Sequence, residues 1–201
     1  MNTLIAGGTG FIGLNLAESI LRSGEHVVIY DPNSLPKAAQ HAFDKLSGTW
    51  CHVQESVTDT EALTNTLIEQ RIKQIFYGAA VTSGPDRERD TPESVLSVNL
   101  VGLASVARLA AKTGIRRLIN LSSGSAYGLP DKDDSEWPAT LREEHTRERP
   151  VSLYALSKFA SEITTRRIAA LTGLDALSVR LSSIFGPWER DTGCRDTLSA
   201  P

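Results

Sequence analysis

The chain is poor in cysteine, in aromatic residues and in excess charge of one sign. Its two cysteines, Cys51 and Cys194, lie far apart, which argues against a disulfide framework and against a thiolate zinc site. The 21 basic and 24 acidic residues leave a net charge of −3, so the chain as a whole is not a strongly basic nucleic-acid binder. The four histidines show no metal-ligand spacing. We therefore expect neither a metal ion nor a nucleic-acid partner.

Long apolar runs are missing as well. The first 20 residues are apolar, but they have no basic beginning and are interrupted by Gly7, Gly8, Gly10 and Gly13, unlike an export signal. No window reaches the roughly 18 uninterrupted apolar residues that a membrane-spanning helix needs. The sequence therefore predicts a cytoplasmic protein without a membrane partner.

What the chain does contain is a regular alternation of short apolar runs and longer segments of helical period. The expected strands are Thr3–Ala6, His26–Tyr30, Trp50–Val53, Gln74–Tyr77, Arg116–Leu121 and Ala176–Arg180. The expected helices are Phe11–Arg22, Asp59–Gln70, Pro92–Lys112 and Ser152–Leu171, with a weaker one at Pro36–Leu46. Because strand-helix-strand alternation implies right-handed crossovers, we predict an α/β fold with a doubly wound parallel sheet and helices on both faces.

A glycine-rich turn joins the first expected strand to the first expected helix. Gly7, Gly10 and Gly13 form G-x-x-G-x-x-G, and Gly8, Gly10 and Gly13 also satisfy G-x-G-x-x-G. Glycines let the backbone approach a pyrophosphate closely, and the N-terminus of the helix that follows offers free N–H groups. A strand before and a helix after are the context that a dinucleotide site requires. The alternative is a tight turn that holds no ligand.

Asp31 ends the second expected strand, 18 residues after Gly13. An acidic residue at this spacing suits the hydroxyls of the adenosine ribose. Its charge would repel a 2′-phosphate, and no Arg or Lys follows before Lys37, so the sequence favours NAD over NADP. The alternative is that Asp31 only forms the turn Asp31-Pro32-Asn33.

Tyr154 and Lys158 are four residues apart and share one face of an expected helix. A phenol with a pKa near ~10 is too weakly acidic to act as a base at neutral pH, but a nearby ammonium group favours its phenolate. The serine-rich segment Ser122–Gly128 follows the fifth strand, at the carboxyl edge where such sheets bind ligands. Ser123 could there orient a substrate oxygen toward Tyr154. The alternative is a loop that caps its own backbone.

Together these segments resemble the extended short-chain dehydrogenase/reductases and, within them, the NAD-dependent epimerase/dehydratase family. The matching positions are Gly7–Gly13, Asp31, Ala79-Ala80, Asn99 in Val98–Gly102, Ser122–Gly128, Pro150–Lys158, Arg180 and Gly186-Pro187. The resemblance implies an NAD-binding Rossmann domain over residues 1–187, with residues 188–201 as the start of a truncated substrate-binding region. It also implies NAD as the cofactor and a sugar or nucleotide sugar as the substrate.

The resemblance implies a role for each matching residue. Ser123, Tyr154 and Lys158 would form the catalytic triad. The residues implied to bind the cofactor are Gly7, Gly10, Phe11, Ile12, Gly13, Asp31, Val57, Ala79, Ala80, Asn99, Tyr154 and Lys158. The helices Pro92–Lys112 and Ser152–Leu171 of two subunits would pair in a homodimer.

Departures from the family pattern narrow the predicted function. Gly124 and Ser125 stand where dehydratases of this family carry an Asp-Glu pair, which argues against a dehydratase and against the related decarboxylases. We expect an NAD-dependent sugar or nucleotide-sugar epimerase or dehydrogenase, with proton transfer at Tyr154, hydride transfer to the nicotinamide, and substrate choice aided by Gly128–Pro150. The alternative is a non-catalytic NAD-binding module or fragment, because family members usually continue into a C-terminal substrate domain.

Overall fold

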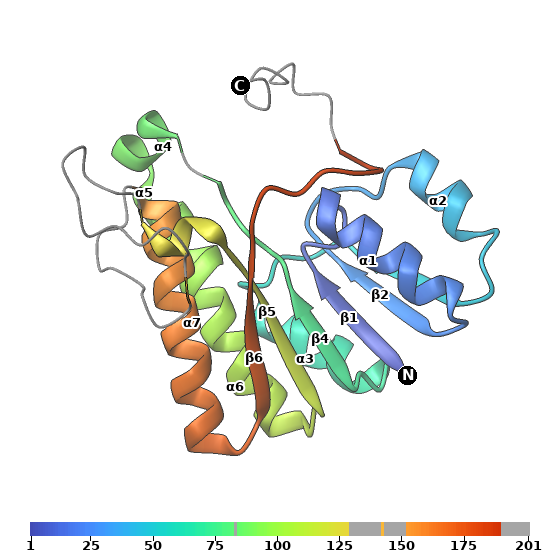
Figure 1. The fold of residues 1–201 in the computed structure, drawn as a ribbon. Coiled ribbons are helices and arrows are strands. Elements are labelled where there is room, and N and C mark those ends of the chain that lie inside the picture. Colours follow the sequence, from blue (N-terminus) through green and yellow to red (C-terminus); the bar gives the residue numbers. More distant parts are fainter. Residues whose placement is uncertain (83, 129–141, 143–151, 190–201) are drawn as a thin grey trace.

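Six parallel strands form the centre of the fold. The computed structural model describes residues 1–82, 84–128, 142 and 152–189. The strands lie in the order β3-β2-β1-β4-β5-β6 (Figure 1). Their bounds are β1 Asn2–Ala6, β2 His26–Tyr30, β3 Thr49–Val53, β4 Gln74–Tyr77, β5 Arg117–Ser123 and β6 Asp175–Leu181. This order confirms the predicted doubly wound parallel sheet, and it reverses between β1 and β4, which is where such sheets open a crevice for ligands.

Helices cover both faces of the sheet (Figure 1). One face carries α1 (Phe11–Arg22) and α2 (Lys37–Phe43), and the other carries α3 (Thr60–Glu69), α6 (Leu103–Thr113) and α7 (Leu153–Thr172). The side chains of a strand alternate between these faces. Leu4 and Ala6 of β1 therefore join the core cluster under α3 and α6, whereas Ile5 joins the cluster under α1 and α2.

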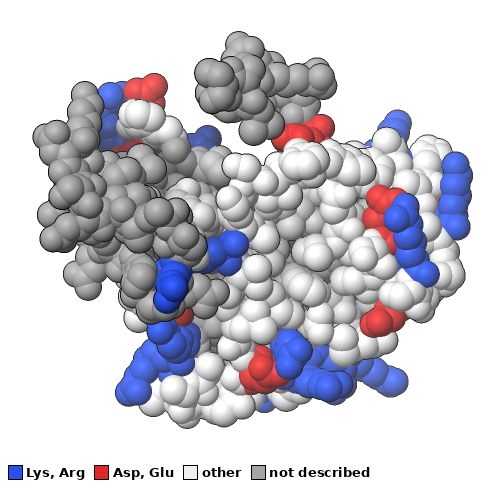
Figure 2. Space-filling model, in the orientation of Figure 1, with Lys and Arg blue, Asp and Glu red and all other residues white. Residues whose placement is uncertain are grey.

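Charged side chains of both signs are mixed on the surface. Figure 2 shows Lys and Arg next to Asp and Glu along the lower and right-hand rim of the face that it presents. One such pair joins Arg117 to Asp175 at 2.7 Å, with both side chains about half exposed. Exposed pairs of this kind contribute little to stability. The expectation that the chain has no nucleic-acid partner stays a prediction.

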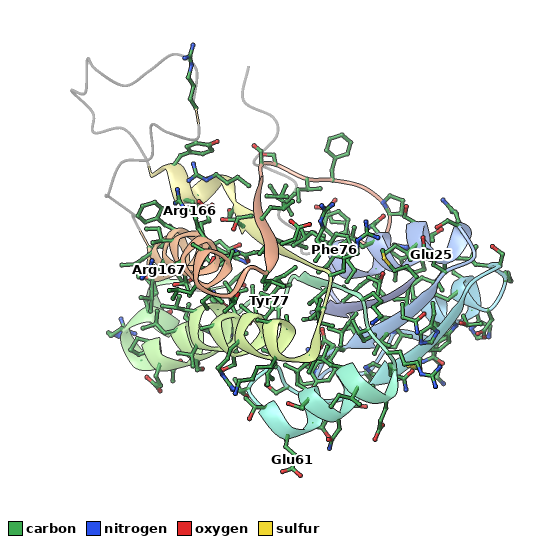
Figure 3. All side chains as sticks on the ribbon, turned by 90° about the horizontal axis from the view of Figure 1, so that it is seen from below. Glu25, Glu61, Phe76, Tyr77, Arg166 and Arg167 are labelled. Carbon is green, nitrogen blue, oxygen red and sulfur yellow. The ribbon has the colours of Figure 1, made fainter. Side chains whose placement is uncertain are left out.

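The expected helix Pro92–Lys112 is continuous but not uniform. It consists of α5 (Pro92–Leu96), a π-helical turn (Ser97–Gly102) and α6. Phe76 and Tyr77 of β4 point to opposite faces of the sheet (Figure 3), and Tyr77 lies beside the π-helical turn. Its hydroxyl donates to the Val98 carbonyl at 2.5 Å, and a Cβ on Gly102 would come within 2.7 Å of that hydroxyl. The missing side chain of Gly102 thus leaves room for the Tyr77 hydroxyl, and helical periodicity alone did not predict the π-helical turn beside it.

This helical run is long and apolar enough to cross a membrane by length and composition alone. Its buried residues include Leu103, Val106 and Ala110, which belong to the core cluster on this face of the sheet. Packing within the fold therefore accounts for part of its apolar composition.

Several expectations fall on residues outside the described ranges. They concern most of the segment Gly128–Pro150, Cys194 and residues 190–201. The proposed division at residue 187 therefore stays a prediction. A short helix before α5, α4 (Pro85–Asp90), was missed by the sequence analysis, although Pro85 at its first position and the acidic residues Asp86 and Glu88 are typical of a helix start.

Candidate active site

A cleft of about 300 Å³ opens at the carboxyl ends of β1, β4 and β5. It brings together nine of the residues predicted from the sequence. These are Gly7, Gly10, Phe11, Ile12, Gly13, Ala80, Ser123, Tyr154 and Lys158. The glycine-rich turn and the predicted catalytic residues, which lie more than a hundred positions apart in the sequence, therefore share one cavity.

Sequence reasoning missed a second set of cleft residues. They are Ile5, Gly78, Thr82, Leu121, Leu181, Ser182 and Ile184. Most of them lie among the last three residues of a strand or follow one directly, so the rule that ligands bind at the carboxyl edge of a parallel sheet could have found them. The exceptions are Thr82 and Ile184, whose places depend on the path of the chain after β4 and after β6. Ser122, which belongs to the serine-rich segment named above, lines the cleft as well.

The glycine-rich turn fits a dinucleotide diphosphate. Gly7 has a φ of +78°, and a Cβ there would lie 2.6 Å from the Ala79 nitrogen. A Cβ on Gly13 would lie 2.5 Å from the Gly7 carbonyl oxygen. Gly10 begins α1 without a side-chain cap, so no side chain occupies the first N–H groups of the helix. Such groups favour a bound anion.

Asp31 is buried beside this turn. One carboxylate oxygen accepts from the Thr9 backbone N–H at 3.2 Å, and the other accepts from the backbone and side-chain N–H groups of Asn33, both at 2.9 Å. The turn that was the alternative for Asp31 is thus present. A carboxylate has about four acceptor sites, so these three bonds leave capacity for a ribose hydroxyl. Asp31 does not line the cleft described above, and neither do Val57, Ala79 and Asn99.

Asn99 connects the segment after β4 to α7. Its side chain accepts from the Val81 N–H at 2.7 Å and donates to the Val81 carbonyl at 3.1 Å. It also donates to the Ser157 hydroxyl at 2.9 Å, and Ser157 stands between Tyr154 and Lys158 in the sequence. This buried amide therefore holds one wall of the cleft against the helix that carries the predicted catalytic residues.

Tyr154 and Lys158 lie on the cleft face of α7. The Ser152 hydroxyl caps this helix by accepting from the Ala155 N–H at 3.0 Å. The Lys158 Nζ lies 5.7 Å from the centroid of the Tyr154 ring and donates to the Leu121 carbonyl at 2.8 Å. Ser123, at the end of β5, donates to the Ser125 hydroxyl at 3.2 Å and stands near the Tyr154 phenol. The three predicted catalytic side chains thus converge from α7 and β5.

Burial shifts the pKa values of both titratable groups. It raises the pKa of the Tyr154 phenol above its ordinary value, and the nearby Ser123 hydroxyl opposes that rise. It lowers the pKa of the Lys158 ammonium to about 8. Each shift favours the neutral form, because a charge loses its hydration in the protein interior. Burial therefore favours the protonated phenol of Tyr154 at neutral pH, whereas Lys158, with a pKa of about 8, is still mostly charged there.

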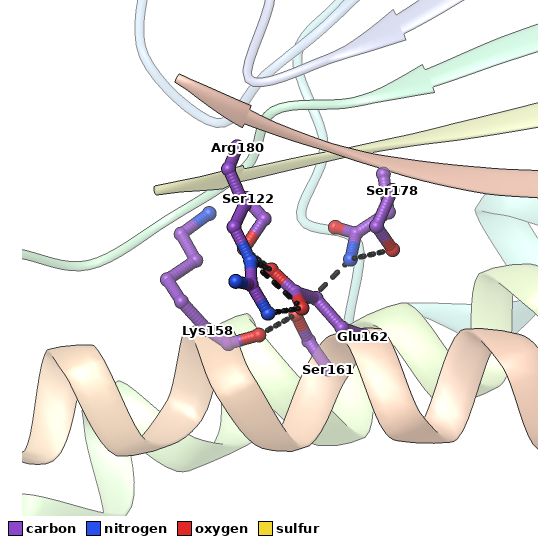
Figure 4. A network of polar contacts seen from close by, with 7 residues as sticks. Ser122, Lys158, Ser161, Glu162, Ser178 and Arg180 are labelled. Carbon is purple, nitrogen blue, oxygen red and sulfur yellow. Dashed lines mark hydrogen bonds and ion pairs between the residues drawn. The ribbon is translucent and has the colours of Figure 1, made fainter. Parts of the chain in front are cut away.

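A buried polar network holds α7 against the ends of β5 and β6 (Figure 4). Glu162, one turn after Lys158, accepts from the Ser122 hydroxyl at 2.5 Å and from Arg180 Nε and Nη2 at 2.9 and 2.7 Å. The Arg180 guanidinium also lies 4.3 Å from the centroid of the Tyr127 ring. Sequence analysis quoted Arg180 but missed Glu162, although Tyr154, Lys158 and Glu162 follow one another at helical spacing.

This ion pair gives a stability prediction. The side chains of Arg180 and Glu162 are only 11% and 9% exposed. Breaking a buried pair leaves a buried charge without that partner, so Glu162→Ala should lower the free energy of unfolding by about 3–5 kcal/mol. Asp175→Ala, which breaks the exposed pair with Arg117, should cost no more than about 1 kcal/mol. Urea denaturation measures both, and equal losses would contradict the role given to Glu162.

Comparison with known proteins gives consistent matches along the chain. The model of the NAD dependent epimerase/dehydratase family matches residues 3–199. A UDP-glucose 4-epimerase of Mycolicibacterium smegmatis is 32% identical over 188 residues, 93% of this chain and 57% of the relative. Among solved structures, a UDP-glucose 4-epimerase of Thermotoga maritima with UDP-glucose has a TM-score of 0.79 at 25% identity. The match covers 94% of this chain and 58% of the Thermotoga chain. A UDP-glucose 4-epimerase of Thermus thermophilus in complex with NAD has a TM-score of 0.73 at 27% identity, over 90% of this chain and 54% of its own.

These matches extend over only part of each relative. The chain spans little more than half the length of the relatives and structures that it resembles. The shared part contains the glycine-rich turn and the positions of Ser123, Tyr154 and Lys158.

Proposed function

The chain belongs to the NAD dependent epimerase/dehydratase family, and we propose that it epimerises a nucleotide sugar by proton transfer at Tyr154. Membership confirms the predicted family and the predicted cofactor, NAD. The observation that carries the proposal is the meeting of Ser123, Tyr154 and Lys158 in the cleft that the glycine-rich turn also lines. The relatives named as UDP-glucose 4-epimerases support a nucleotide sugar as the substrate.

The chain's own residues would hold the cofactor at the carboxyl edge of the sheet, where the strand order reverses between β1 and β4. Gly7, Gly10 and Gly13, with the N-terminus of α1, would receive the diphosphate. Asp31 would accept a hydrogen bond from the adenosine ribose. NAD, when bound, supplies the hydride acceptor and donor of the reaction.

The proton chemistry would fall to Tyr154. Its oxygen would take the proton from the sugar hydroxyl whose carbon is oxidised, and would give it back when that carbon is reduced on the opposite face. Ser123 would donate a hydrogen bond to the same sugar oxygen. The Lys158 ammonium, 5.7 Å from the Tyr154 ring centroid, would favour the phenolate.

Product analysis with a nucleotide-sugar substrate tests this proposal. An epimerase forms the epimer of the substrate without net NADH, because the hydride returns to the sugar. A dehydrogenase accumulates one NADH for each sugar oxidised. The non-catalytic alternative gives neither product although NAD binds. Chromatography of the sugars, with NADH absorbance followed in parallel, separates the three results.

Asp31 should set the choice between NAD and NADP. Its buried carboxylate would repel a 2′-phosphate, so we expect the wild type to bind NAD about 100-fold more tightly than NADP, and Asp31→Asn to narrow this ratio about tenfold. Fluorescence titration with the two reduced cofactors measures the ratio. Glu61→Gln is the control, since Glu61 points away from the sheet at the outer surface of α3 (Figure 3). A ratio unchanged in Asp31→Asn would exclude this role.

We also propose that the chain pairs with a second copy through α6 and α7. A groove of about 380 Å³ between these helices is lined mainly by apolar side chains, among them Val101 and Leu171. These two side chains are 58% and 64% exposed. A contiguous apolar surface that is exposed in this way often marks a site of protein–protein interaction. Sedimentation equilibrium tests the proposed homodimer.

The cytoplasmic location stays a prediction.

A further inference from the structure

The chain crosses the top of the sheet after β6. The segment Ser182–Glu189, called here the crossing segment, runs from the β6 edge toward α1 and α2 on the other side of the fold (Figure 1). Ser182 and Ile184, near its start, line the same cleft as the glycine-rich turn. Pro187 and Trp188, near its end, contact the α1–α2 layer. The segment therefore spans the cleft between two points of attachment.

The far attachment combines polar and apolar contacts. The Asn15 amide of α1 donates to the Pro187 carbonyl at 2.7 Å. The Trp188 indole N–H donates to a Glu18 carboxylate oxygen, also at 2.7 Å. The Trp188 ring meets the fully buried Phe43 ring edge-on, with centroids 6.3 Å apart. A hydrogen bond to a charged acceptor together with an aromatic contact makes this a specific attachment.

The backbone at Trp188 also indicates that its side chain holds the segment in place. Its φ is +69°, a conformation that residues with a side chain rarely adopt. Such a conformation persists only where surrounding contacts determine it, and it is a reason to look for a function. Trp188 contacts Glu18 and Phe43 and packs against the apolar cluster under α1 and α2.

The attachment lies next to the cofactor cleft. Gly10, Phe11 and Ile12, at the start of α1, form one wall of that cleft, and Asn15 follows on the next turn of the same helix. Asn15 also donates to the Phe11 carbonyl at 2.9 Å, so one amide joins the cleft wall to the crossing segment. A dinucleotide in this cleft would lie between the glycine-rich turn and the crossing segment.

We propose that Trp188, with Asn15 and Glu18, is a positioning residue for cofactor retention: it fixes the crossing segment on α1 so that Ser182 and Ile184 stay against the bound NAD. Trp188 itself does not line the cleft. It acts through the segment, and release of NAD then requires the attachment on α1 to open. The inference depends on NAD binding but not on the sugar reaction proposed above.

The dissociation rate of NADH tests this inference without any sugar. Bound NADH is displaced by excess NAD in a stopped-flow instrument, and its fluorescence is followed. Because Trp188→Ala removes both the indole hydrogen bond and the ring contact, we expect dissociation to be about 10- to 100-fold faster, with the association rate changed by less than about threefold. Trp188→Phe keeps a ring against Phe43 and should lie between the wild type and Trp188→Ala.

Trp50→Ala is the matched control. Trp50 of β3 contacts the same Phe43 ring edge-on at 6.2 Å, and its indole N–H donates to Asp44 at 3.1 Å. The two tryptophans thus make the same kinds of contact, but Trp50 is not on the crossing segment. We expect the Trp50→Ala protein to release NADH within about twofold of the wild-type rate.

A second variant keeps the inference testable if Trp188→Ala does not fold. Glu18→Ala removes the acceptor of the indole on α1, together with the ion pair that Glu18 makes with Arg22, and should speed dissociation several-fold. Equal effects of Trp188→Ala and Trp50→Ala would overturn the inference, as would an unchanged rate in both Trp188→Ala and Glu18→Ala. If the variants release NADH as expected here but the wild type does not epimerise a nucleotide sugar, only the proposed reaction would be contradicted.

Discussion

Replacing Tyr154 by phenylalanine should lower the rate of epimerisation by about 10²–10⁴-fold, the usual contribution of a general acid–base group. The change removes one oxygen, the atom that would take and return the sugar proton. The ring keeps its place on α7, since the Ser152 cap and the polar network at Glu162 do not involve the phenol. Because Tyr154 is also implied to contact the cofactor, NAD affinity should fall, but by less than about tenfold and far less than turnover. Steady-state kinetics and a separate cofactor titration measure the two quantities.

Tyr30→Phe is the control for this experiment. It makes the same chemical change at a buried tyrosine of β2, whose hydroxyl donates to the Ser56 carbonyl at 3.4 Å and does not line the cleft. Its turnover should remain close to that of the wild type. If Tyr154→Phe kept full turnover, another group would have to carry the proton, and the proposed role of Tyr154 would be wrong.

The second large effect is expected at Gly10. A Cβ there would meet only the Gly7 carbonyl oxygen, at 3.3 Å, so Gly10→Ala should fold, with a loss of about 1 kcal/mol at this helix-capping position. The added methyl group would nevertheless stand in the cleft, where the backbone must approach the diphosphate closely. We expect NAD affinity to fall about 10- to 100-fold. Calorimetric titration gives the affinity, and thermal unfolding reports the stability.

Gly84→Ala is the matched control for Gly10→Ala. Gly84 also precedes the first residue of a helix, α4, and nothing lies within 4 Å of an added Cβ. The same substitution at this second helix start should therefore leave NAD affinity unchanged. An equal loss of affinity in both variants would show that the effect at Gly10 does not come from the cleft.

The parts of the site that the sequence predicted are those encoded locally. The turn from Gly7 to Gly13 lies between β1 and α1 as expected, because glycine spacing and the flanking apolar pattern specify it within a dozen residues. Tyr154 and Lys158 face the same cleft because helical periodicity fixes their relation. The doubly wound parallel sheet followed from the right-handed crossovers that strand-helix alternation imposes, whereas the order of its strands was not predicted.

The parts that the sequence did not predict depend on contacts between distant segments. Trp188 meets Glu18 across 170 positions, and neither residue shows in its neighbours that it will bond to the other. Glu162 looks like one of several charged residues on a helix until β5 and β6 bring Ser122 and Arg180 to it. The π-helical turn contacts the Tyr77 hydroxyl, which comes from β4 and lies beside Gly102. Each of these features arises from packing, which composition and periodicity do not specify.

The most direct test of the proposed reaction uses UDP-glucose that carries deuterium at the sugar carbon C4. If the carbon is oxidised and reduced again while Tyr154 exchanges a proton only at oxygen, the epimer should retain the deuterium, even in ordinary water. Mass spectrometry of the separated sugars measures this retention. Deuterium lost to the solvent would mean that the proton is removed from carbon, and would contradict the mechanism proposed here. Full retention in the wild-type product, together with no labelled epimer from Tyr154→Phe, would support it.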